Sequence, residues 1–572
     1  MPFLRRKSKQ LSNQVEAVVK ATSRHSEDKK DAQVRKNIAI IGSGVSGLTC
    51  AHYLVTQFDV TIFEASDYIG GHVNTIDVTL QDGKKAKPNK VEKSAIDTGF
   101  IVFNERTYPN FFRLLHELQV PFQATDMSFS VKNTARNFEY NGHTLNTLLS
   151  QRKNLLNPKF WGFINDILQF NKQVRQLRQD YDKAREQGQG QDIAVFTKQT
   201  LGEYLDTKKY GDLFTDNYLL PMVSAIWSTS LRDVRDFPLV FFAQFFDNHG
   251  LLDVVNRPQW FTIKGGSKQY VNKLIKRFVK AGGSVRVNSP VQSVIREDNK
   301  VILNVTDTTD NKTQGLVFDE VIFACHADTA LKILQDANPI EQEVLTHFTF
   351  TDNTAVLHTD TSVLPKKPLA WASWNYLIDD KNAIKKDKAS LQTATKPVLT
   401  YHMNILQRLT KQHNYLVTLN HEVDESQVIK RIDYSHPVFN NEMIAAQAQW
   451  SNISGSSDSH THFCGAYWFN GFHEDGVRSA LRVCQALGCN IDIKDSVDLS
   501  HLPDAESAHT PFRYKDLPVK ADKQLRKLKK RQLVTATTNQ ELVQYIAMLA
   551  PVAKAFKKKK LGFFAARKDK HS

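Results

Sequence analysis

This sequence has little cysteine and no long apolar run, and each of these features excludes a class of protein. Five cysteines occur among 572 residues, and none of them forms a CxxC pair. A disulfide framework is therefore excluded, and we expect a reducing, cytoplasmic compartment. Nowhere do about 18–20 apolar residues follow one another, as a membrane-spanning helix requires. The basic N-terminus also lacks the apolar segment of a secretory signal.

The positive charge is concentrated at the two ends of the chain. The net charge is +15, yet residues 513–572 alone hold 17 Lys and Arg against 4 Asp and Glu, and residues 1–36 hold 10 against 4. The body between them is slightly acidic, whereas a nucleic-acid enzyme carries its charge beside its site, so we expect no nucleic acid partner.

The basic C-terminal tail has a composition that suits a membrane surface. An apolar stretch at 541–556 precedes four lysines at 557–560, and Phe563 and Phe564 follow. Such a segment can anchor a protein peripherally on an anionic membrane, here the inner face. It can equally pack on the body, or stay in solvent without a partner.

A glycine-rich motif stands at the start of the body. The apolar run at 37–41 predicts a strand, a helix follows the glycines, and a second strand at 59–63 ends at an acidic residue. This is the order of a dinucleotide-binding unit, in which glycines allow a tight turn and close approach to a pyrophosphate, and the acid binds the ribose hydroxyls. The residues predicted to bind are Gly42, Gly44, Val45, Ser46, Gly47, Glu64 and Ala65.

Distant glycine pairs favour FAD over NAD as the dinucleotide. Gly70 and Gly71 precede His72, a second pair stands at 265–266, and GAYWFNGFHEDG closes the body from Gly465. An NAD domain has no need of such remote segments, whereas FAD is longer and needs them for its ribityl chain and ring.

These elements resemble the flavin amine oxidase, protoporphyrinogen oxidase and phytoene desaturase superfamily. Glu64 with Gly70 and Gly71 is similar to its E-A-x(n)-G-G-R pattern, with His72 in the arginine place. The closing segment is similar to its last flavin motif, where a helix N-terminus faces the ring. The resemblance implies flavin contacts from Gly465 and the backbone of Asp475, Gly476 and Val477, and an adenine contact from Val291.

A closer resemblance covers nearly all of residues 37–488. Strings such as IDTGFIVFNERTYPNF, RPQWFTIKGGSKQYV, VIFACHADTAL and GAYWFNGFHEDGVRSAL resemble bacterial predicted FAD-binding oxidoreductases, which are often encoded beside cyclopropane-fatty-acid synthases. This resemblance implies a lipid context and a lipid-modifying methyltransferase as a partner.

The expected fold class is α/β, a two-domain FAD-binding Rossmann-like fold of the amine oxidase type with a mixed α+β substrate domain. Residues 37–110, 260–330 and 460–490 are assigned to the FAD domain, and 111–259 and 331–459 to the substrate domain, with 111–250 largely helical. Residues 1–36 form a basic N-terminal segment that we expect to be disordered, and 491–572 form the basic tail.

The chemistry of the site is less well defined by the sequence. The candidate bases are His249, His326 and Asp97, each of which can instead have a structural role. Amine oxidases of the superfamily place a lysine near the flavin, but the corresponding stretch, FTFTDNTAVLHTD, offers only Asn353 or His358. Trp371, Trp374 and Tyr376 line the substrate cavity or belong to a strand core. No pair of residues at metal-ligand spacing accompanies His473, so we expect no metal.

The expected function is oxidation or desaturation of a lipid acyl chain, or of another hydrophobic substrate, by hydride transfer to the N5 atom of FAD. One alternative is an amine oxidase that produces peroxide. The other is a redox-silent flavoprotein that docks on a lipid-modifying methyltransferase.

Overall fold

The structure is a computed structural model. It describes residues 35–81, 91–189, 193, 196–253, 257–379, 396–409, 412–455 and 459–496. The predicted N-terminal segment up to residue 34 and the basic tail from residue 497 lie outside the described residues.

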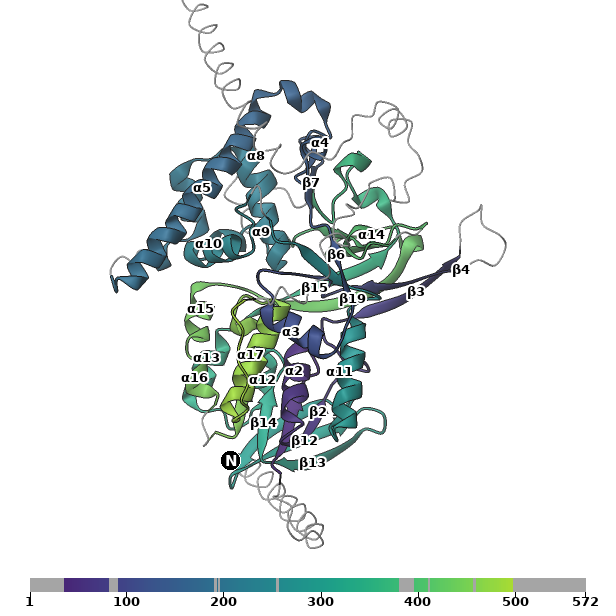
Figure 1. The fold of residues 1–572 in the computed structure, drawn as a ribbon, viewed down its shortest axis with the longest axis vertical. Helices are drawn as coiled ribbons and strands as arrows, with labels where there is room; N and C mark the ends of the chain where they lie inside the picture. Colours follow the sequence, from purple (N-terminus) through teal and green to yellow (C-terminus); the bar gives the residue numbers. More distant parts are fainter. Residues whose placement is uncertain are drawn as a thin grey trace, which may run out of the picture.

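A five-stranded parallel sheet forms the centre of one half of the molecule (Figure 1). The two strands around the glycine motif have the predicted bounds, and their neighbours come from far along the chain. The inner strands are apolar and buried on both faces, as parallel strands usually are. In sheet order the strands are β10 (Ser284–Arg286), β2 (Asp59–Phe63), β1 (Asn37–Ile41), β14 (Glu320–Phe323) and β20 (Thr461–Phe463).

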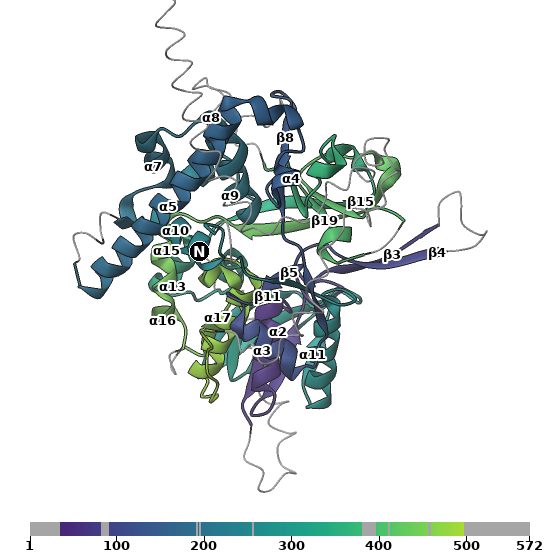
Figure 2. The ribbon, with the colours of Figure 1, turned by 45° about the horizontal axis from the view of Figure 1, so that its top comes forward.

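Three helices gather beside this sheet: α2 (Val45–Leu54), α11 (Lys268–Lys280) and α17 (His473–Ala486), as Figures 1 and 2 show. A second sheet packs against the first, with Phe318 meeting Phe63 edge-on at 5.8 Å between ring centroids. This antiparallel sheet consists of β11 (Val291–Glu297), β12 (Lys300–Asp307) and β13 (Lys312–Phe318).

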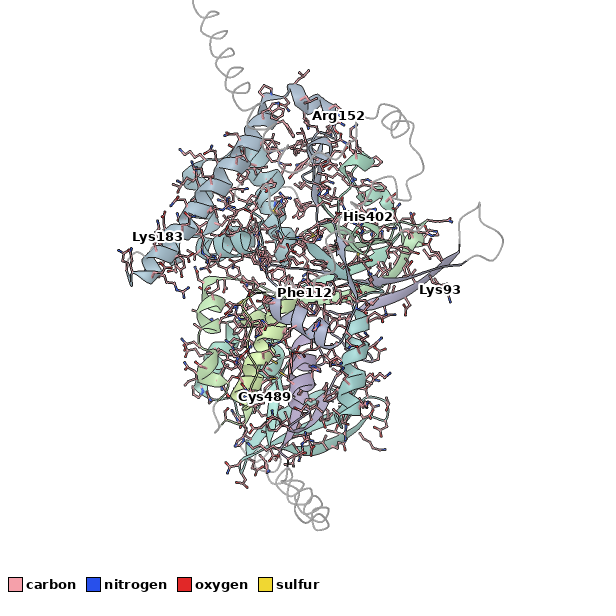
Figure 3. All side chains as sticks on the ribbon, in the orientation of Figure 1. Lys93, Phe112, Arg152, Lys183, His402 and Cys489 are labelled. Carbon is pink, nitrogen blue, oxygen red and sulfur yellow. The ribbon has the colours of Figure 1, made fainter. Side chains whose placement is uncertain are left out.

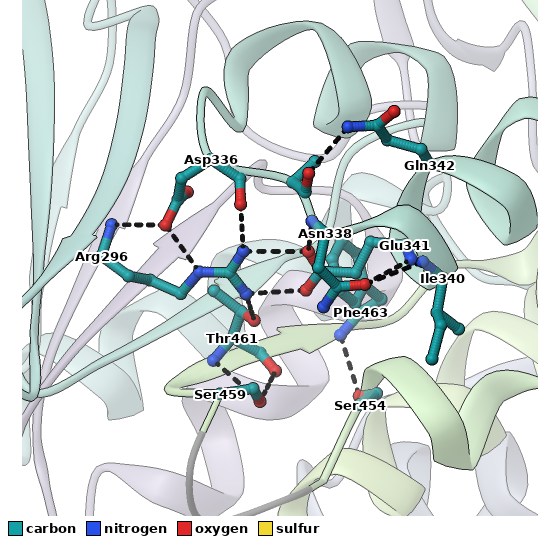
Figure 4. A network of polar contacts seen from close by, with 11 residues as sticks. Arg296, Asp336, Asn338, Ile340, Glu341, Gln342, Ser454, Ser459, Thr461 and Phe463 are labelled. Atoms are coloured by element: carbon teal, nitrogen blue, oxygen red, sulfur yellow. Dashed lines mark hydrogen bonds and ion pairs between the residues drawn. The ribbon is translucent and has the colours of Figure 1, made fainter.

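A partly buried arginine joins β11 to the edge of the parallel sheet (Figure 4). Arg296 donates two parallel hydrogen bonds to Glu341, at 2.7 and 2.9 Å, and Nε donates to Asp336 at 2.9 Å. The same guanidinium reaches Thr461 of β20 at 3.3 Å. Glu341 belongs to α13 (Pro339–Thr346), so this helix packs beside the parallel sheet although its residues were assigned to the substrate domain. The division of the chain at the predicted domain boundaries stays a prediction.

A seven-stranded mixed sheet and a group of helices form the other half. The strands, in order, are β19 (Val428–Pro437), β15 (Phe350–His358), β18 (Leu416–Leu419), β17 (Leu399–His402), β16 (Trp374–Ile378), β7 (Phe129–Asn133) and β8 (Phe138–Asn141). The larger helices are α5 (Pro158–Glu186), α7 (Leu201–Lys208), α9 (Leu220–Trp227) and α10 (Leu239–Asn248). Among the described residues, no helix combines the length and apolar character needed to span a bilayer.

The helical prediction for residues 111–250 is wrong at three short segments. β7 pairs with β16 and β8, and β6 (Phe122–Thr125) pairs with β9 (Trp260–Ile263). Strands of four or five residues are too short to show a period of their own, and β6 and β7 pair with strands from distant parts of the chain. The third strand of the β6 sheet is β5 (Val102–Asn104).

A hairpin of β3 (Thr75–Gln81) and β4 (Val91–Asp97) extends from the side of the molecule (Figure 1). Its base lies beside the turn that opens α11, where Thr75 accepts a hydrogen bond from the backbone of Lys268 at 2.9 Å. The carboxyl ends of β1, β2 and β14 open between this hairpin base and the seven-stranded sheet, and that is where the cavity lies.

Candidate functional site

One cavity of about 1020 Å³ reaches from the parallel sheet into the other half of the molecule. Its inner end is lined by the residues that follow β1, β2 and β14. In doubly wound sheets, ligands bind outside the carboxyl ends of strands at the point where the strand order reverses, here between β1 and β14.

The three motif glycines stand in different surroundings. Gly42 has φ of +104°, and a Cβ there would lie 2.8 Å from the carbonyl oxygen of Ala324. A Cβ on Gly47 would lie 2.1 Å from the carbonyl oxygen of Gly42, so α2 can begin this close to β1 only with glycine. A Cβ on Gly44, by contrast, would have no heavy atom within 4 Å. Gly44 faces open space in the cavity, as do Val45 and Ser46.

Glu64 is fixed at the end of β2 by donors from two turns. Its Oε2 accepts hydrogen bonds from the backbone and hydroxyl of Ser43, at 2.9 and 2.6 Å, and its Oε1 accepts from the backbone of Ser66 at 2.9 Å. Glu64, Ala65 and Val291 all line the cavity. Ser43 was not predicted, because nothing in the motif marks the variable residue between its glycines as a partner of the acid.

His72 opens a cluster of aromatic residues that the sequence did not reveal. Gly70 and Gly71 have φ of +134° and +57° and turn the chain so that His72 faces the cavity. The His72 ring stacks on Tyr434 at 4.9 Å and lies 5.3 Å from His436. Burial, with the neighbouring histidines, holds the pKa of His72 well below its usual value. Its Nε2 is buried and has no hydrogen-bond partner among the described residues.

Asp97 does not line the cavity, which corrects its prediction as a base. Its carboxylate accepts hydrogen bonds from the backbone and hydroxyl of Ser267, both at 2.8 Å, from Thr75 at 2.5 Å and from Gln407 at 3.1 Å. Burial raises the pKa of Asp97 to about 6, although these donors stabilise the anion. Asp97 therefore fixes the turn at 265–267, where a Cβ on Gly266 would lie 2.6 Å from Thr75.

We expect Asp97→Asn to destabilise the fold rather than to stop chemistry. In the variant, the asparagine NH₂ group replaces one carboxylate oxygen and faces hydrogen-bond donors that it cannot accept from. A buried group left without a hydrogen-bond partner costs about 1–3 kcal/mol. The free energy of unfolding, from urea denaturation, should fall by that amount. Asp77→Asn, on the same hairpin, is the matched control, because the ion pair of the exposed Asp77 with Lys268 of α11 contributes little. A stable Asp97→Asn protein whose flavin is no longer reduced by substrate would restore the catalytic assignment.

The helix α17 begins at His473, two residues before Asp475, the first of the three residues whose backbone was expected to contact the flavin. Gly476 donates its N–H to the carbonyl of Phe472 at 3.1 Å, so that group is not free for a ligand. A Cβ on Gly476 would lie 2.5 Å from Val45, which shows that this glycine packs α17 against α2. Asp475, Gly476 and Val477 do not line the cavity; Gly465, Phe472 and His473 do. The free N–H groups of a helix are those of its first turn, here residues 473–475.

Glu474 joins two helix N-termini beside the cavity. It accepts hydrogen bonds from the backbone of Asn110 at 3.1 Å and of Phe111 at 2.8 Å, in the first turn of α3 (Pro109–Glu117). Burial raises its pKa to about 8. The adjacent His473 stacks on Phe100 at 3.7 Å and contacts the Tyr270 hydroxyl at 2.7 Å.

His249 and His326 both line the cavity, but they come from different halves. His249 ends α10; its Nδ1 lies 2.9 Å from the Phe245 carbonyl, which makes Nδ1 the protonated nitrogen and leaves Nε2 as an acceptor. Burial lowers the pKa of His249 to about 4, so the ring is neutral at pH 7. His326 follows β14 and stacks on Phe350 at 4.1 Å, and burial lowers its pKa also.

Comparison with known proteins identifies the family. Residues 45–366, more than half of the chain, match the family model described as flavin containing amine oxidoreductase. The chain belongs to this family. It is a flavin oxidoreductase with the amine oxidase type of fold.

Solved structures share the fold of this flavin oxidoreductase at low sequence identity. A proposed protoporphyrinogen oxidase from Exiguobacterium sp. 255-15 is 15% identical with a TM-score of 0.51, covering 80% of this chain and 99% of its own. Cyclohexylamine oxidase from Brevibacterium oxydans IH-35A is 14% identical with a TM-score of 0.51, covering 79% and 99%. A CLA-producing fatty acid isomerase from P. acnes is 13% identical with a TM-score of 0.52, covering 80% and 99%. No curated protein matches the sequence significantly.

The inner end of the cavity fits a flavin nucleotide. Gly44 leaves open space at the N-terminus of α2, where backbone N–H groups bind phosphates. Glu64 offers a carboxylate in the same cavity wall that contains Val291, and the Nε2 of His72, which has no partner among the described residues, offers a hydrogen bond. Among the described residues, no group of three or more His, Cys, Asp or Glu is placed to hold a metal.

The outer end of the cavity is mainly aromatic and apolar. No lysine is among the described residues that line the cavity. Asn353 supports the cavity residue His436 through a contact of 3.2 Å, whereas His358 contacts Thr418 inside the seven-stranded sheet. Of the three predicted aromatic residues, Trp374 lines the cavity and Trp371 and Tyr376 are buried elsewhere. Other residues of the outer end are Tyr218, Met222, Trp227, Tyr401, Leu419 and Phe439.

Proposed function

We propose that this flavin oxidoreductase uses FAD to oxidise or desaturate a lipid acyl chain or a similar hydrophobic substrate. The observation that carries the proposal is the continuity of the cavity, which joins a nucleotide cradle to an aromatic chamber. FAD is favoured over a shorter flavin because Glu64 and Val291 line the same cavity as the substrate end, and an adenosine occupies such positions in dinucleotide folds.

Different residues would bind the nucleotide and take part in the reaction. The turn at 42–47, Glu64 and His72 would hold the nucleotide, and the first turn of α17 would face its ring with N–H groups. When bound, FAD supplies a hydride acceptor at N5 for an oxidation in which the substrate also gives up a proton. His249 or His326 would take that proton, since each is neutral and reaches the cavity.

A hydrophobic substrate suits the outer chamber. Its wall is built from aromatic and aliphatic side chains, and its charged members are few, among them Asp126 and Arg257. The fatty acid isomerase shows that this fold can act on an acyl chain. The absence of lysine from the cavity lining, as far as the described residues show it, weighs against an amine oxidase, although the family match keeps amine oxidation as the second candidate.

The deciding experiment is anaerobic. Purified holoprotein is mixed with fractionated membrane lipids, and the visible absorption of the flavin is followed. Bleaching by one fraction supports the proposal, and analysis of that fraction should show a product with two hydrogens fewer per flavin reduced. Admitting air or an added electron acceptor should restore the colour.

Other results point to the alternatives. Rapid bleaching by a small amine, with peroxide formed in air, would establish an amine oxidase. Moved double bonds without net bleaching would indicate a redox-neutral isomerase. Bound flavin that no fraction reduces, together with a stable methyltransferase complex, would indicate the redox-silent partner.

Attachment to the inner membrane face through residues 491–572 stays a proposal as well, because residues 497–572 lie outside the described residues. Sedimentation with anionic liposomes, with and without residues 513–572, tests it. Unchanged binding after removal would contradict anchoring by the tail.

A further inference from the structure

Two neighbouring leucines project from the helical half of the molecule. Leu156 is 91% exposed and Leu155 is 46% exposed. They belong to the short helix η1 (Arg152–Leu156), which connects α4 (Leu145–Leu148) to α5. Figure 3 places Arg152 at the outer end of the half that carries these helices, far from Cys489 in the half with the parallel sheet. Single exposed apolar residues are ordinary, but an adjacent pair at a tip is not.

The surrounding hydrogen bonds hold the leucines outward. Trp161 donates from Nε1 to the carbonyl of Leu155 at 3.0 Å, and Arg152 donates to the carbonyl of Leu149 at 2.9 Å. Asn157 caps α5 by accepting from the backbone of Lys159 at 3.1 Å. Because both sides of the turn are tied down, the backbone that carries Leu155 and Leu156 cannot turn toward the core without breaking these bonds.

The charge around the tip has one sign. Arg152, Lys153 and Lys159 are exposed, and the sequence has no Asp or Glu between Tyr140 and Asp166. Cations near an anionic bilayer contribute on the order of 1 kcal/mol each, and apolar side chains beside them add to the binding when they enter the interface.

A bilayer fits this tip better than a protein partner does. A stable protein interface buries about 1,200–2,000 Å² with a packed apolar centre. Two leucines and a half-buried tryptophan cannot supply such a centre, whereas the headgroup region accepts small apolar insertions.

The tip also connects to the wall of the cavity through packed rings. Ring centroids of Trp161 and Phe160 are 5.8 Å apart, those of Phe160 and Phe163 are 5.8 Å apart, and those of Phe163 and Tyr218 are 6.1 Å apart. Tyr218 lines the cavity. The helix α5, which begins two residues after Leu156, therefore packs against a wall residue of the substrate chamber.

We propose that residues 152–161 form a membrane-contact tip, which inserts Leu155 and Leu156 into the headgroup region of an anionic lipid bilayer while Arg152, Lys153 and Lys159 face the anionic headgroups. This contact is separate from the basic tail and does not depend on which substrate is oxidised.

A probe at the tip tests the proposal in the full chain, with the tail present throughout. Leu156→Cys carries an environment-sensitive fluorophore, and Ile340→Cys, at a residue that is 50% exposed on α13, is the matched control. The native protein treated with the same reagent corrects for labelling of its own cysteines. Vesicles contain phosphatidylcholine alone or with about 30% phosphatidylglycerol.

The expected result is a blue shift and a rise in emission at position 156 with anionic vesicles, and no change at position 340. No shift at position 156 would overturn the proposal even if the protein binds through its tail. An equal shift on neutral vesicles would overturn the role of the basic residues.

Partitioning provides a second measurement. Leu155→Asn with Leu156→Asn should lower the partition coefficient on anionic vesicles about tenfold, whereas Val279→Asn with Ile340→Asn should leave it unchanged. Lys153→Glu with Lys159→Glu should weaken binding more than Lys276→Glu with Lys280→Glu on α11. Flavin reduction measured without vesicles should be the same in all these variants, and equal losses in tip and control variants would refute a specific tip.

Discussion

Gly44→Val should give a folded protein that no longer holds its flavin. The backbone at Gly44 is extended, with φ of −65° and ψ of 178°, so a β-branched residue is tolerated there. A Cβ at this position meets no heavy atom within 4 Å. The same open space faces the cavity at the N-terminus of α2, so the valine methyl groups would occupy the place of the diphosphate.

The expected loss of flavin affinity is large because the diphosphate can approach the backbone closely only where residue 44 has no side chain. Loss of the phosphate contacts at a helix N-terminus should weaken flavin binding at least a hundredfold, which is about 3 kcal/mol. We expect a colourless protein after purification, and titration of the apoprotein with FAD should give the ratio of Kd values. The melting temperature of the apoprotein should be close to that of the parent apoprotein.

Gly162→Val is the matched control. A Cβ on Gly162 also has no heavy atom within 4 Å, but this residue lies on α5, away from the nucleotide end. It should retain flavin, and its free energy of unfolding should change by less than about 0.5 kcal/mol, with a small gain expected because valine has a somewhat higher helix propensity than glycine. Normal flavin affinity in Gly44→Val would show that the nucleotide does not pass this turn, and the proposed function would lose its foundation.

The sequence was sufficient to predict those parts of the fold that depend on residues close together in the chain. Gly42 to Glu64 form one continuous strand–turn–helix–strand unit, so the period of the apolar residues and the glycine spacing predicted both strands and the turn. The prediction was coarser at the start of α17, where backbone contacts were expected from residues 475–477 but the free N–H groups belong to residues 473–475. The N–H of Gly476 is bonded to the carbonyl of Phe472.

The rest of the site depends on contacts between distant segments. Tyr434 and His436 reach His72 because β19 crosses beside the turn after β2, and no local pattern on β19 announces this. Asp97 was misread for a related reason. A carboxylate at the end of a strand and close to a glycine is a reasonable candidate for a catalytic base. Only the fold shows that the hydrogen-bond partners of Asp97 include Ser267 and Thr75. Side-chain direction at such a strand end is set by tertiary packing, which a single sequence does not contain.

His249 is the better of the two remaining candidates for the proton acceptor, because a hydrogen bond fixes its tautomer. Its Nδ1 is committed to the Phe245 carbonyl, so the lone pair of Nε2 stays available, and the stack on Phe245 at 3.9 Å fixes the ring. His326 has a stacking partner in Phe350, but no hydrogen bond that selects its tautomer is seen among the described residues.

His249→Gln should therefore slow anaerobic flavin reduction by the identified substrate about a hundredfold or more, in the range of general base catalysis. Flavin affinity should change little, because the nucleotide-binding residues lie in the other half. His326→Gln is the matched comparison, since it removes a partly buried, cavity-lining histidine whose pKa is also lowered, and its effect should be much smaller. The reverse order of the two effects would transfer the role to His326.

The pH dependence supplies an independent readout of the same group. Burial lowers the pKa of His249 to about 4, below the ordinary value of 6.5, so the ring can accept a proton at any pH above about 5. The reduction rate of the parent protein should thus stay level from pH 8 down to about 5 and fall only as the ring becomes protonated near pH 4. A descending limb near pH 6.5 would mean that a solvated histidine is the acceptor, because desolvation is what separates His249 from an ordinary imidazole.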